Sequence, residues 1–204
     1  MYRISLIIGF VVVLVIIGLH RKAMKEAKPV KSAAVPAGKR GFGQILVWLI
    51  HAATLLCFLA LGITGFYLSL FAGEPMSGFP LMLHATAAPV FAVCLVALAV
   101  VRVHGCRFDE RDWNYLTRTF SWKGFDETAP RSSATVIWSK VFFWGMILLS
   151  LPVILSIALS MLPLFGTAGQ KFLYHLHRYS TLLLVMNGAL FGYLSMMAGR
   201  QSGK

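Results

Sequence analysis

Acidic residues are scarce in this chain of 204 residues, which has seven Asp and Glu against 19 Lys and Arg and a formal net charge of +12. A positive excess of this size can indicate binding to nucleic acid. The sequence, however, has no basic stripe interleaved with aromatic residues in a polar context. The basic residues lie between long apolar runs, where the cytoplasmic loops of membrane proteins carry their Lys and Arg. We therefore expect no nucleic-acid partner.

Cysteine is also rare, with Cys57, Cys94 and Cys106 as its three residues. They form neither a C-x-x-C nor a C-x-x-C-H motif. A disulfide framework, a zinc site and a covalently attached cofactor therefore have no support. Cys57 and Cys94 lie inside apolar runs, where we expect them to be packing residues. The sequence also lacks internal repeats.

Long apolar runs dominate the chain. Apolar residues make up 58% of it, against roughly 45–50% in a typical soluble protein. This composition predicts an all-α integral membrane protein. The expected membrane-spanning segments are Ile4–Leu19, Ile45–Phe71, Leu81–Val103, Thr135–Leu164 and Phe172–Met197. The last four have the length of about 20 residues that a helix needs to cross the hydrocarbon core, and Pro152 is expected to kink the fourth.

The first segment is the shortest, and a run of 16 residues can also be the core of a signal peptide. Three features favour a retained anchor over residues 1–20. The segment has no clear small-residue cleavage site, Arg21 and Lys22 follow it at once, and only Arg3 precedes it. We expect a transmembrane helix whose N-terminus lies outside the cytoplasm.

Charge alternates between the connecting loops. Residues 21–44 carry seven Lys and Arg and residues 104–134 carry five, whereas residues 72–80 and 166–171 carry one charged residue each. The positive-inside rule then places the two basic loops and the C-terminus in the cytoplasm. We expect a multi-pass protein of the bacterial inner membrane, with a solvated basic linker at 21–44 whose charges would also bind anionic lipid headgroups. The loop 104–134 combines aromatic and acidic residues, which predicts an amphipathic element at the membrane interface.

The histidines divide by membrane side under this topology. His84, His175 and His177 fall near the outer face, and His20, His51 and His104 fall near the inner face. An ionisable residue inside a membrane segment is a functional candidate. His84 and His177 lie at similar depth on two segments that run in the same direction. Two imidazoles at one level are what a b-type haem needs as axial ligands. The alternative is that each imidazole only forms a hydrogen bond at the interface.

Three further residues fit this haem hypothesis. Gly62 and Gly65 fall on the face of His51 but near the outer end of their segment, where glycine lets a flat macrocycle approach the backbone. Ordinary helix packing explains them equally well. Arg178 could pair with a haem propionate or reach the lipid headgroups. His175 points to a different face from His177 and is interpreted as an interface residue.

Short motifs occur in a fixed order over residues 47–197. They are His-x-x-Thr at 51–54, Thr-Gly-Phe at 64–66, a His at 84, Arg-Val-His at 102–104, Lys-Val-Phe-Phe-Trp at 140–144 and Leu-His-Arg-x-x-Thr at 176–181. In this order and spacing the chain resembles the cytochrome b (gamma) subunit of membrane-bound formate dehydrogenases. The same family includes the cytochrome b subunits of NiFe hydrogenases and thiosulfate reductases.

This resemblance implies a four-helix haem-binding transmembrane bundle over residues 45–199, with one extra N-terminal transmembrane helix. It implies an outer haem b held by His84 and His177. The family's inner haem uses a His that matches His51 and a second His on the last helix, where this chain has Phe191. We therefore expect one haem, with His51 either a relic or a quinone ligand. The alternative is a second haem held by His51 and His20.

The function that the resemblance implies is electron transfer within a respiratory oxidoreductase complex. Electrons would pass between a periplasmic iron–sulfur or multihaem subunit and membrane menaquinone or ubiquinone. The chain is too short for a dehydrogenase domain of its own, so we expect a non-catalytic subunit. A haem-free membrane anchor of a redox complex is the alternative. A transporter is disfavoured because the sequence has no pair of corresponding broken helices.

Overall fold

The computed structural model of the protein describes residues 2–26, 42–67, 71, 76–120, 131–162 and 164–202. Within these ranges the chain forms six helices and no strand. The helices are α1 (Tyr2–Glu26), α2 (Phe42–Tyr67), α3 (Gly78–Val103), α4 (Glu110–Phe120), α5 (Arg131–Ser160) and α6 (Thr167–Ser202). All except α4 are long and apolar enough to cross a membrane. The prediction of an all-α, multi-pass membrane protein is therefore confirmed.

The helices extend beyond the apolar segments in several places. Helix α1 continues past Leu19 to Glu26, and α6 begins at Thr167 and continues to Ser202. Lys, Arg, Glu and Gln are good helix formers, so the hydropathy pattern marks the apolar length of a helix and not its ends. Helix α5 is instead shorter at its C-terminal end than its apolar segment, since it ends at Ser160 and not at Leu164. It also continues through Pro152 as one helix.

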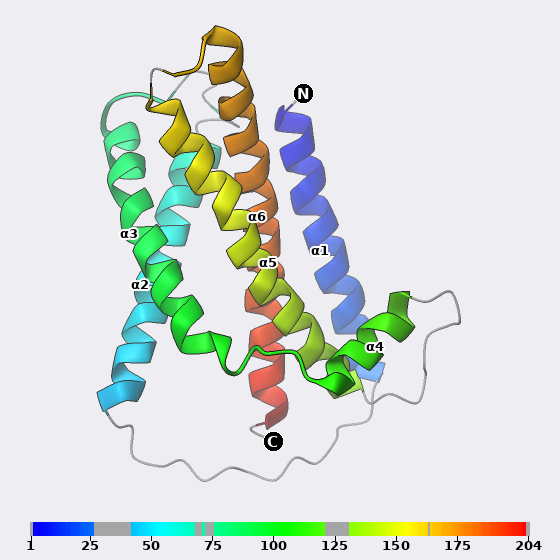
Figure 1. The fold of residues 1–204 in the computed structure, drawn as a ribbon. Helices are drawn as coiled ribbons and strands as arrows, with labels where there is room; N and C mark the ends of the chain where they lie inside the picture. The colour runs from blue at the N-terminus through cyan, green and yellow to red at the C-terminus, as the bar shows by residue number, and fades with distance from the viewer. Residues whose placement is uncertain are drawn as a thin grey trace.

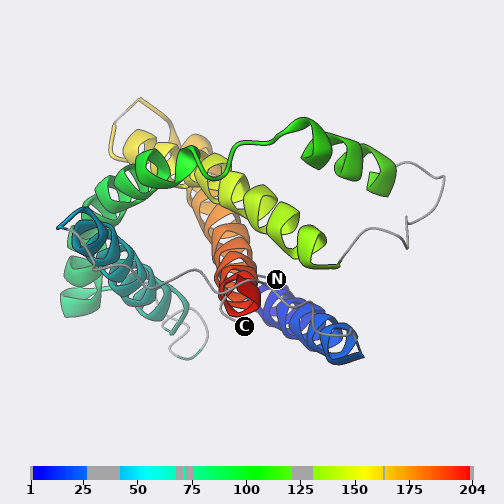
Figure 2. The ribbon, with the colours of Figure 1, turned by 90° about the horizontal axis from the view of Figure 1, so that it is seen from below.

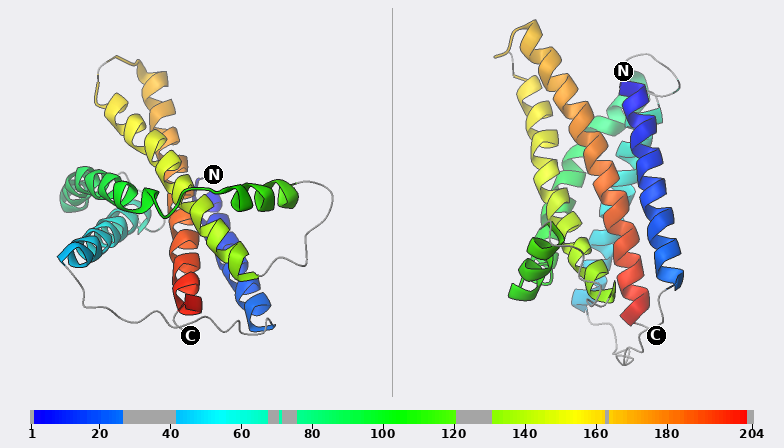
Figure 3. Two further views of the ribbon diagram at one scale, coloured as in Figure 1. Left: turned by 60° about the horizontal axis from the view of Figure 1, so that its bottom comes forward. Right: turned by 90° about the vertical axis from the view of Figure 1, so that its right-hand side faces the viewer.

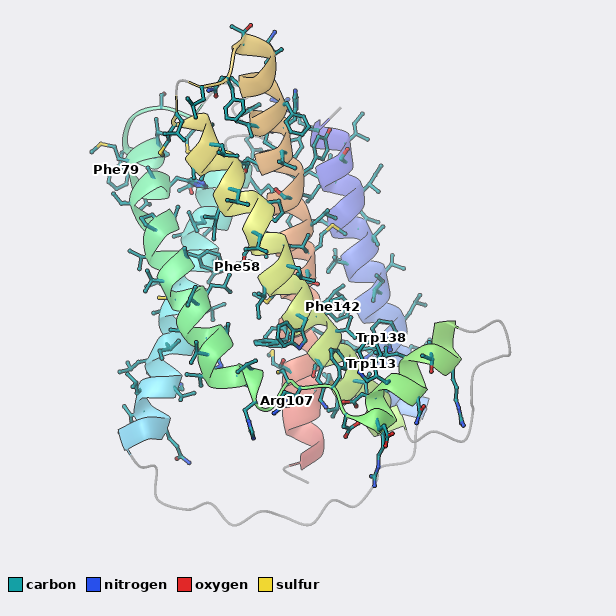
Figure 4. All side chains as sticks on the ribbon, in the orientation of Figure 1. Phe58, Phe79, Arg107, Trp113, Trp138 and Phe142 are labelled. Atoms are coloured by element: carbon teal, nitrogen blue, oxygen red, sulfur yellow. The ribbon has the colours of Figure 1, made fainter. Side chains whose placement is uncertain are left out.

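Two antiparallel pairs, α2 with α3 and α5 with α6, make up the bundle (Figure 1). They meet in a core of Phe91 and Leu95 from α3, Met146 from α5 and Leu184 from α6. Phe58 of α2 joins this core at mid-height (Figure 4). Large apolar side chains on the outer faces remain exposed, as expected for helices surrounded by lipid.

Helix α1 packs along α6 and reaches the upper part of α2 (Figures 1 and 3). Leu6 is only 1% exposed and contacts Phe66 and Leu182. Near the other end of α1, the His20 Nδ1 atom lies 2.9 Å from the Tyr193 hydroxyl of α6. The extra helix therefore contacts the rest of the bundle near both of its ends.

Asn187 of α6 packs against α5 in the half of the bundle that carries the C-terminus. Its side-chain amide donates to the Phe142 carbonyl at 2.6 Å, and Phe142 is labelled in Figure 4. Gly145 makes room for it, because a Cβ atom at this position would lie 2.6 Å from Asn187 Oδ1. This polar contact joins the two helices where water is absent.

The contact predicts that Gly145→Ala destabilises the protein by about 1–2 kcal/mol, through overpacking and loss of the Asn187 hydrogen bond. Thermal unfolding of the detergent-solubilised chain measures the effect. Gly192→Ala is the matched control, because a Cβ atom there meets nothing within 4 Å. Equal melting temperatures for the two variants would contradict this account of the contact.

Helix α4 lies across the lower end of the bundle beside α5 (Figures 1 and 2). Asp109 and Asp112 cap its first turn reciprocally: the Asp112 amide donates to Asp109 Oδ1 at 2.8 Å, and the Asp109 amide donates to Asp112 Oδ2 at 3.0 Å. Asp112 also forms an ion pair with Lys140 of α5 at 2.6 Å. The predicted amphipathic element is therefore a helix. Its Asp112 and Leu116 side chains are buried, whereas Trp113 is exposed.

The loop before α4 is held by a second contact with α5. The indole of Trp144 donates to the Cys106 carbonyl at 3.0 Å. Burial raises the pKa of the Cys106 thiol, so this side chain stays protonated near neutral pH. The loop and α4 together therefore have a fixed position on α5.

Acidification is expected to loosen the first turn of α4. The hydrogen bond from the Asp112 amide lowers the pKa of the Asp109 carboxyl from its usual value of 3.8. A group whose pKa is lower in the folded chain stabilises it above the unfolded pKa, and this stabilisation is lost as pH falls through the folded pKa. Amide hydrogen exchange across residues 109–113, corrected for intrinsic pH dependence, should increase below about pH 4. Asp109→Asn keeps a good cap and should weaken the pH dependence, because of the two capping carboxylates only that of Asp112 then titrates. An unchanged profile would contradict this account.

Candidate functional site

His84 and His177 lie in the same half of the bundle, on helices that run in the same direction. Helices α3 and α6 both begin at the end that carries the N-terminus of the chain (Figure 1). Both side chains are partly buried. His84 contacts α2, and His177 contacts α5. The structure therefore places the two residues that the sequence paired in the same half of the bundle.

The contacts of Thr64 favour one tautomer of His84. The Thr64 hydroxyl has one proton, and it donates to the Ala60 carbonyl at 2.7 Å. Its oxygen therefore accepts at the second contact, 2.9 Å from His84 Nδ1. The proton of a neutral His84 is then on Nδ1, and its Nε2 atom keeps a lone pair.

His177 has the same tautomer for a similar reason. Its Nδ1 atom lies 3.2 Å from the Val153 carbonyl, which can only accept. Ser156 donates to the same carbonyl at 2.9 Å, and its hydroxyl oxygen lies 3.3 Å from His177 Nδ1. The proton of the neutral ring is on Nδ1, so Nε2 again keeps its lone pair.

A glycine of α2 lies against the His84 ring. A Cβ atom on Gly65 would lie 3.4 Å from His84 Cε1, so this glycine lets the ring approach the α2 backbone. A Cβ atom on Gly62, one turn away, would meet nothing within 4 Å. Two imidazoles with bonded Nδ1–H groups and available Nε2 atoms are a suitable donor pair for axial metal ligation.

His51 has a protein partner at each of its two ring nitrogens. Its Nδ1 atom lies 2.7 Å from the Val47 carbonyl, which places the proton on Nδ1. Its Nε2 atom accepts from Arg102 Nε at 3.1 Å. The lone pair that would bind a metal therefore has a protein donor, and Arg102 is a partner that the sequence did not indicate.

His20 does not join His51. It packs edge-on against the Tyr193 ring, with centroids 5.4 Å apart, and α1 and α2 diverge toward their lower ends (Figures 1 and 2). The alternative of a second site made by His20 and His51 is therefore not formed in this arrangement. Among the described residues, no group of three or more His, Cys, Asp or Glu side chains is placed to hold a metal ion.

Arg178 contacts α1 and its own helix. Its guanidinium carbon lies 3.7 Å from the centroid of the Tyr2 ring, and Nη1 donates to the Tyr174 hydroxyl at 3.2 Å. The Tyr2 hydroxyl donates to the Arg178 carbonyl at 3.2 Å. His175 is exposed and stacks beside Tyr174. The partners of Arg178 named here are therefore tyrosines, and His175 lies on an exposed face of α6.

The residues that orient the two imidazoles had weak sequence signals or none. Thr64 belongs to the Thr-Gly-Phe motif, but the sequence assigned it no role. The carbonyl of Val153 has no side-chain signature at all. A search against known protein families, curated proteins and solved structures finds no match to this chain. The similarity to the cytochrome b subunits therefore depends on the short motifs alone.

Proposed function

We propose that this protein binds one b-type haem between His84 and His177 and passes electrons through it within a membrane oxidoreductase complex. The observation that carries the proposal is that the Nδ1 atom of each imidazole lies within hydrogen-bond distance of a protein oxygen. With the proton of each neutral ring on Nδ1, the Nε2 lone pair would be the one available to a metal. A haem ligated by two imidazoles supplies one-electron redox chemistry.

Neighbouring residues orient His84 and His177, and the contacts of the inner half of the bundle bear on how many haems the chain binds. Thr64 and the Val153 carbonyl hold the imidazoles by hydrogen bonds that also increase the basicity of Nε2. Arg102 donates to His51 Nε2, and Phe191 is at the position where the similar family has its other inner ligand. These features support a single haem in the outer half of the bundle.

The same hydrogen bond predicts a large effect of Thr64→Val. This variant has a similar shape but cannot accept the His84 Nδ1–H, so haem affinity should fall by about 10–100-fold. Titration of haem into haem-depleted protein measures the change. Thr64→Ser retains the acceptor and should recover most of the affinity. A Thr64→Val variant with wild-type affinity would show that Thr64 does not orient the ligand.

The topology supports a place between a periplasmic partner and the quinone pool of the bacterial inner membrane. The two basic loops and the C-terminus lie toward one side by the positive-inside rule, so His84 and His177 lie toward the other. An iron–sulfur or multihaem subunit would exchange electrons with the haem from that side, and menaquinone or ubiquinone would do so from within the membrane. The chain itself contributes ligands, orientation and a docking surface.

Redox spectroscopy of the purified protein tests this proposal. The dithionite-reduced minus oxidised difference spectrum should show a b-type α-band, and a soluble quinone analogue should reoxidise the reduced protein. A protein that lacks the band would instead support the haem-free anchor. A band that no quinone reoxidises would contradict the assigned electron acceptor.

A further inference from the structure

The hydroxyl of Thr181 is a buried polar atom without a hydrogen-bond partner among the described residues. Thr54, Thr64, Thr86, Thr117 and Thr119 each donate to the carbonyl four residues earlier in their own helix. The equivalent acceptor for Thr181 is the His177 carbonyl, which is instead 3.3 Å from the Ser180 hydroxyl. Thr181 therefore differs from these threonines in leaving its donor unused.

Helix geometry places Thr181 beside the His84–His177 site. It follows His177 by one turn and precedes Gly188 by two turns, so the three share a face of α6. Gly188 contacts α2, because a Cβ atom there would lie 3.1 Å from Phe58 Cζ. Helices α2 and α6 are antiparallel (Figure 1), so two turns from this contact Thr181 lies level with Gly65.

The other faces of α6 have their own neighbours. Leu182 and Met186 face α1, where Met186 Sδ would lie 2.9 Å from a Cβ atom on Gly9. Asn187 faces α5 through its bond with the Phe142 carbonyl. The face with Thr181 lies between these two, and its other members contact α2 through Gly188 and α5 through His177.

We propose that Thr181 is a third contact of the group bound at the His84–His177 site, an inference that rests on the proposed function. Its hydroxyl donates to the occupant, either directly or through an ordered water. On haem b the acceptors at the edge of the macrocycle are the propionate carboxylates. Thr181 thus helps to determine which edge of the macrocycle faces α6, and its donor is satisfied only when the site is filled.

The test compares Thr181→Val with wild type in two states of the full-length chain, purified with haem and depleted of it. In the depleted state the variant should melt at a higher temperature, because it removes an unpaired buried hydroxyl without changing the side-chain shape. In the loaded state the haem dissociation constant should increase by about two- to tenfold. The haem midpoint potential should shift, and Thr181→Ser should restore the wild-type values. This opposite sign in the two states separates a ligand contact from a packing role.

Thr54→Val is the matched control, because Thr54 is a buried threonine whose hydroxyl already donates to the Ile50 carbonyl at 2.7 Å. It should leave haem affinity and potential unchanged. A Thr181→Val variant with wild-type affinity and potential would overturn the inference and leave the haem assignment intact. A wild-type protein that binds no haem would overturn both. A lower melting temperature of Thr181→Val in both states would show that Thr181 is only a packing residue.

Discussion

His84→Ala and His177→Ala are each expected to abolish the b-type absorption band of the purified protein. Each substitution removes one of the two imidazoles that would hold the haem, and a haem left with one protein ligand would not give the spectrum of a bis-histidine b-type centre. His84 is on α3 and His177 is on α6. Because the proposed site needs one imidazole from each helix, loss of either should have the same effect on the spectrum. The spectrum of each variant, measured at equal protein concentration, gives the result directly.

Two controls separate ligand loss from misfolding. His175→Ala should keep the band, because His175 is exposed and lies two residues from the ligand on another face of α6. Free imidazole added to His84→Ala or His177→Ala should restore part of the band, because each substitution leaves space where a ring was removed. A band that survives in the His84→Ala, His177→Ala double variant would rule out this ligand pair.

Asp112→Asn is expected to lower the free energy of unfolding by about 3 kcal/mol. The ion pair of Asp112 with Lys140 is 2.6 Å long, and the two side chains are only 8% and 15% exposed. Breaking a nearly buried pair by removing one charge is costly, since the other charge stays buried without its partner. Asn at this position can still accept the Asp109 amide, so the helix cap is largely retained.

A double-variant cycle tests the origin of this loss. Asp112→Asn combined with Lys140→Met leaves no unpaired charge and should recover most of the stability. Denaturant unfolding of the detergent-solubilised protein, followed by circular dichroism, gives the four free energies. Equal losses for the single and double variants would show that packing of α4, and not the ion pair, is responsible.

The sequence predicted the membrane helices well because hydropathy and length report the segments that lie in lipid. It predicted their ends less well, because helices such as α1 continue through Lys and Arg beyond the apolar run. Topology placed His84 and His177 at similar depth, and the structure has them in the same half of the bundle. The contacts of the rings could not be predicted, since the partner of His177 Nδ1 is the main-chain carbonyl of Val153, which no residue type marks.

The inner half of the bundle was harder to predict for a similar reason. His51 and His20 lie near the same membrane side, which made a shared site plausible. Each instead has its own partner, Arg102 for His51 and Tyr193 for His20. These contacts depend on how α1, α2 and α3 are arranged in space, which the order of apolar segments does not specify.

The number of haems per chain tests the central claim most directly. Pyridine haemochrome analysis gives the amount of haem b, and quantitative amino-acid analysis of the same sample gives the amount of protein. We predict one haem per chain, because the hydrogen-bond contacts of His84 and His177 within the described part of the chain are at Nδ1, while the Nε2 atom of His51 accepts from Arg102. Two haems per chain, or none, would contradict the account.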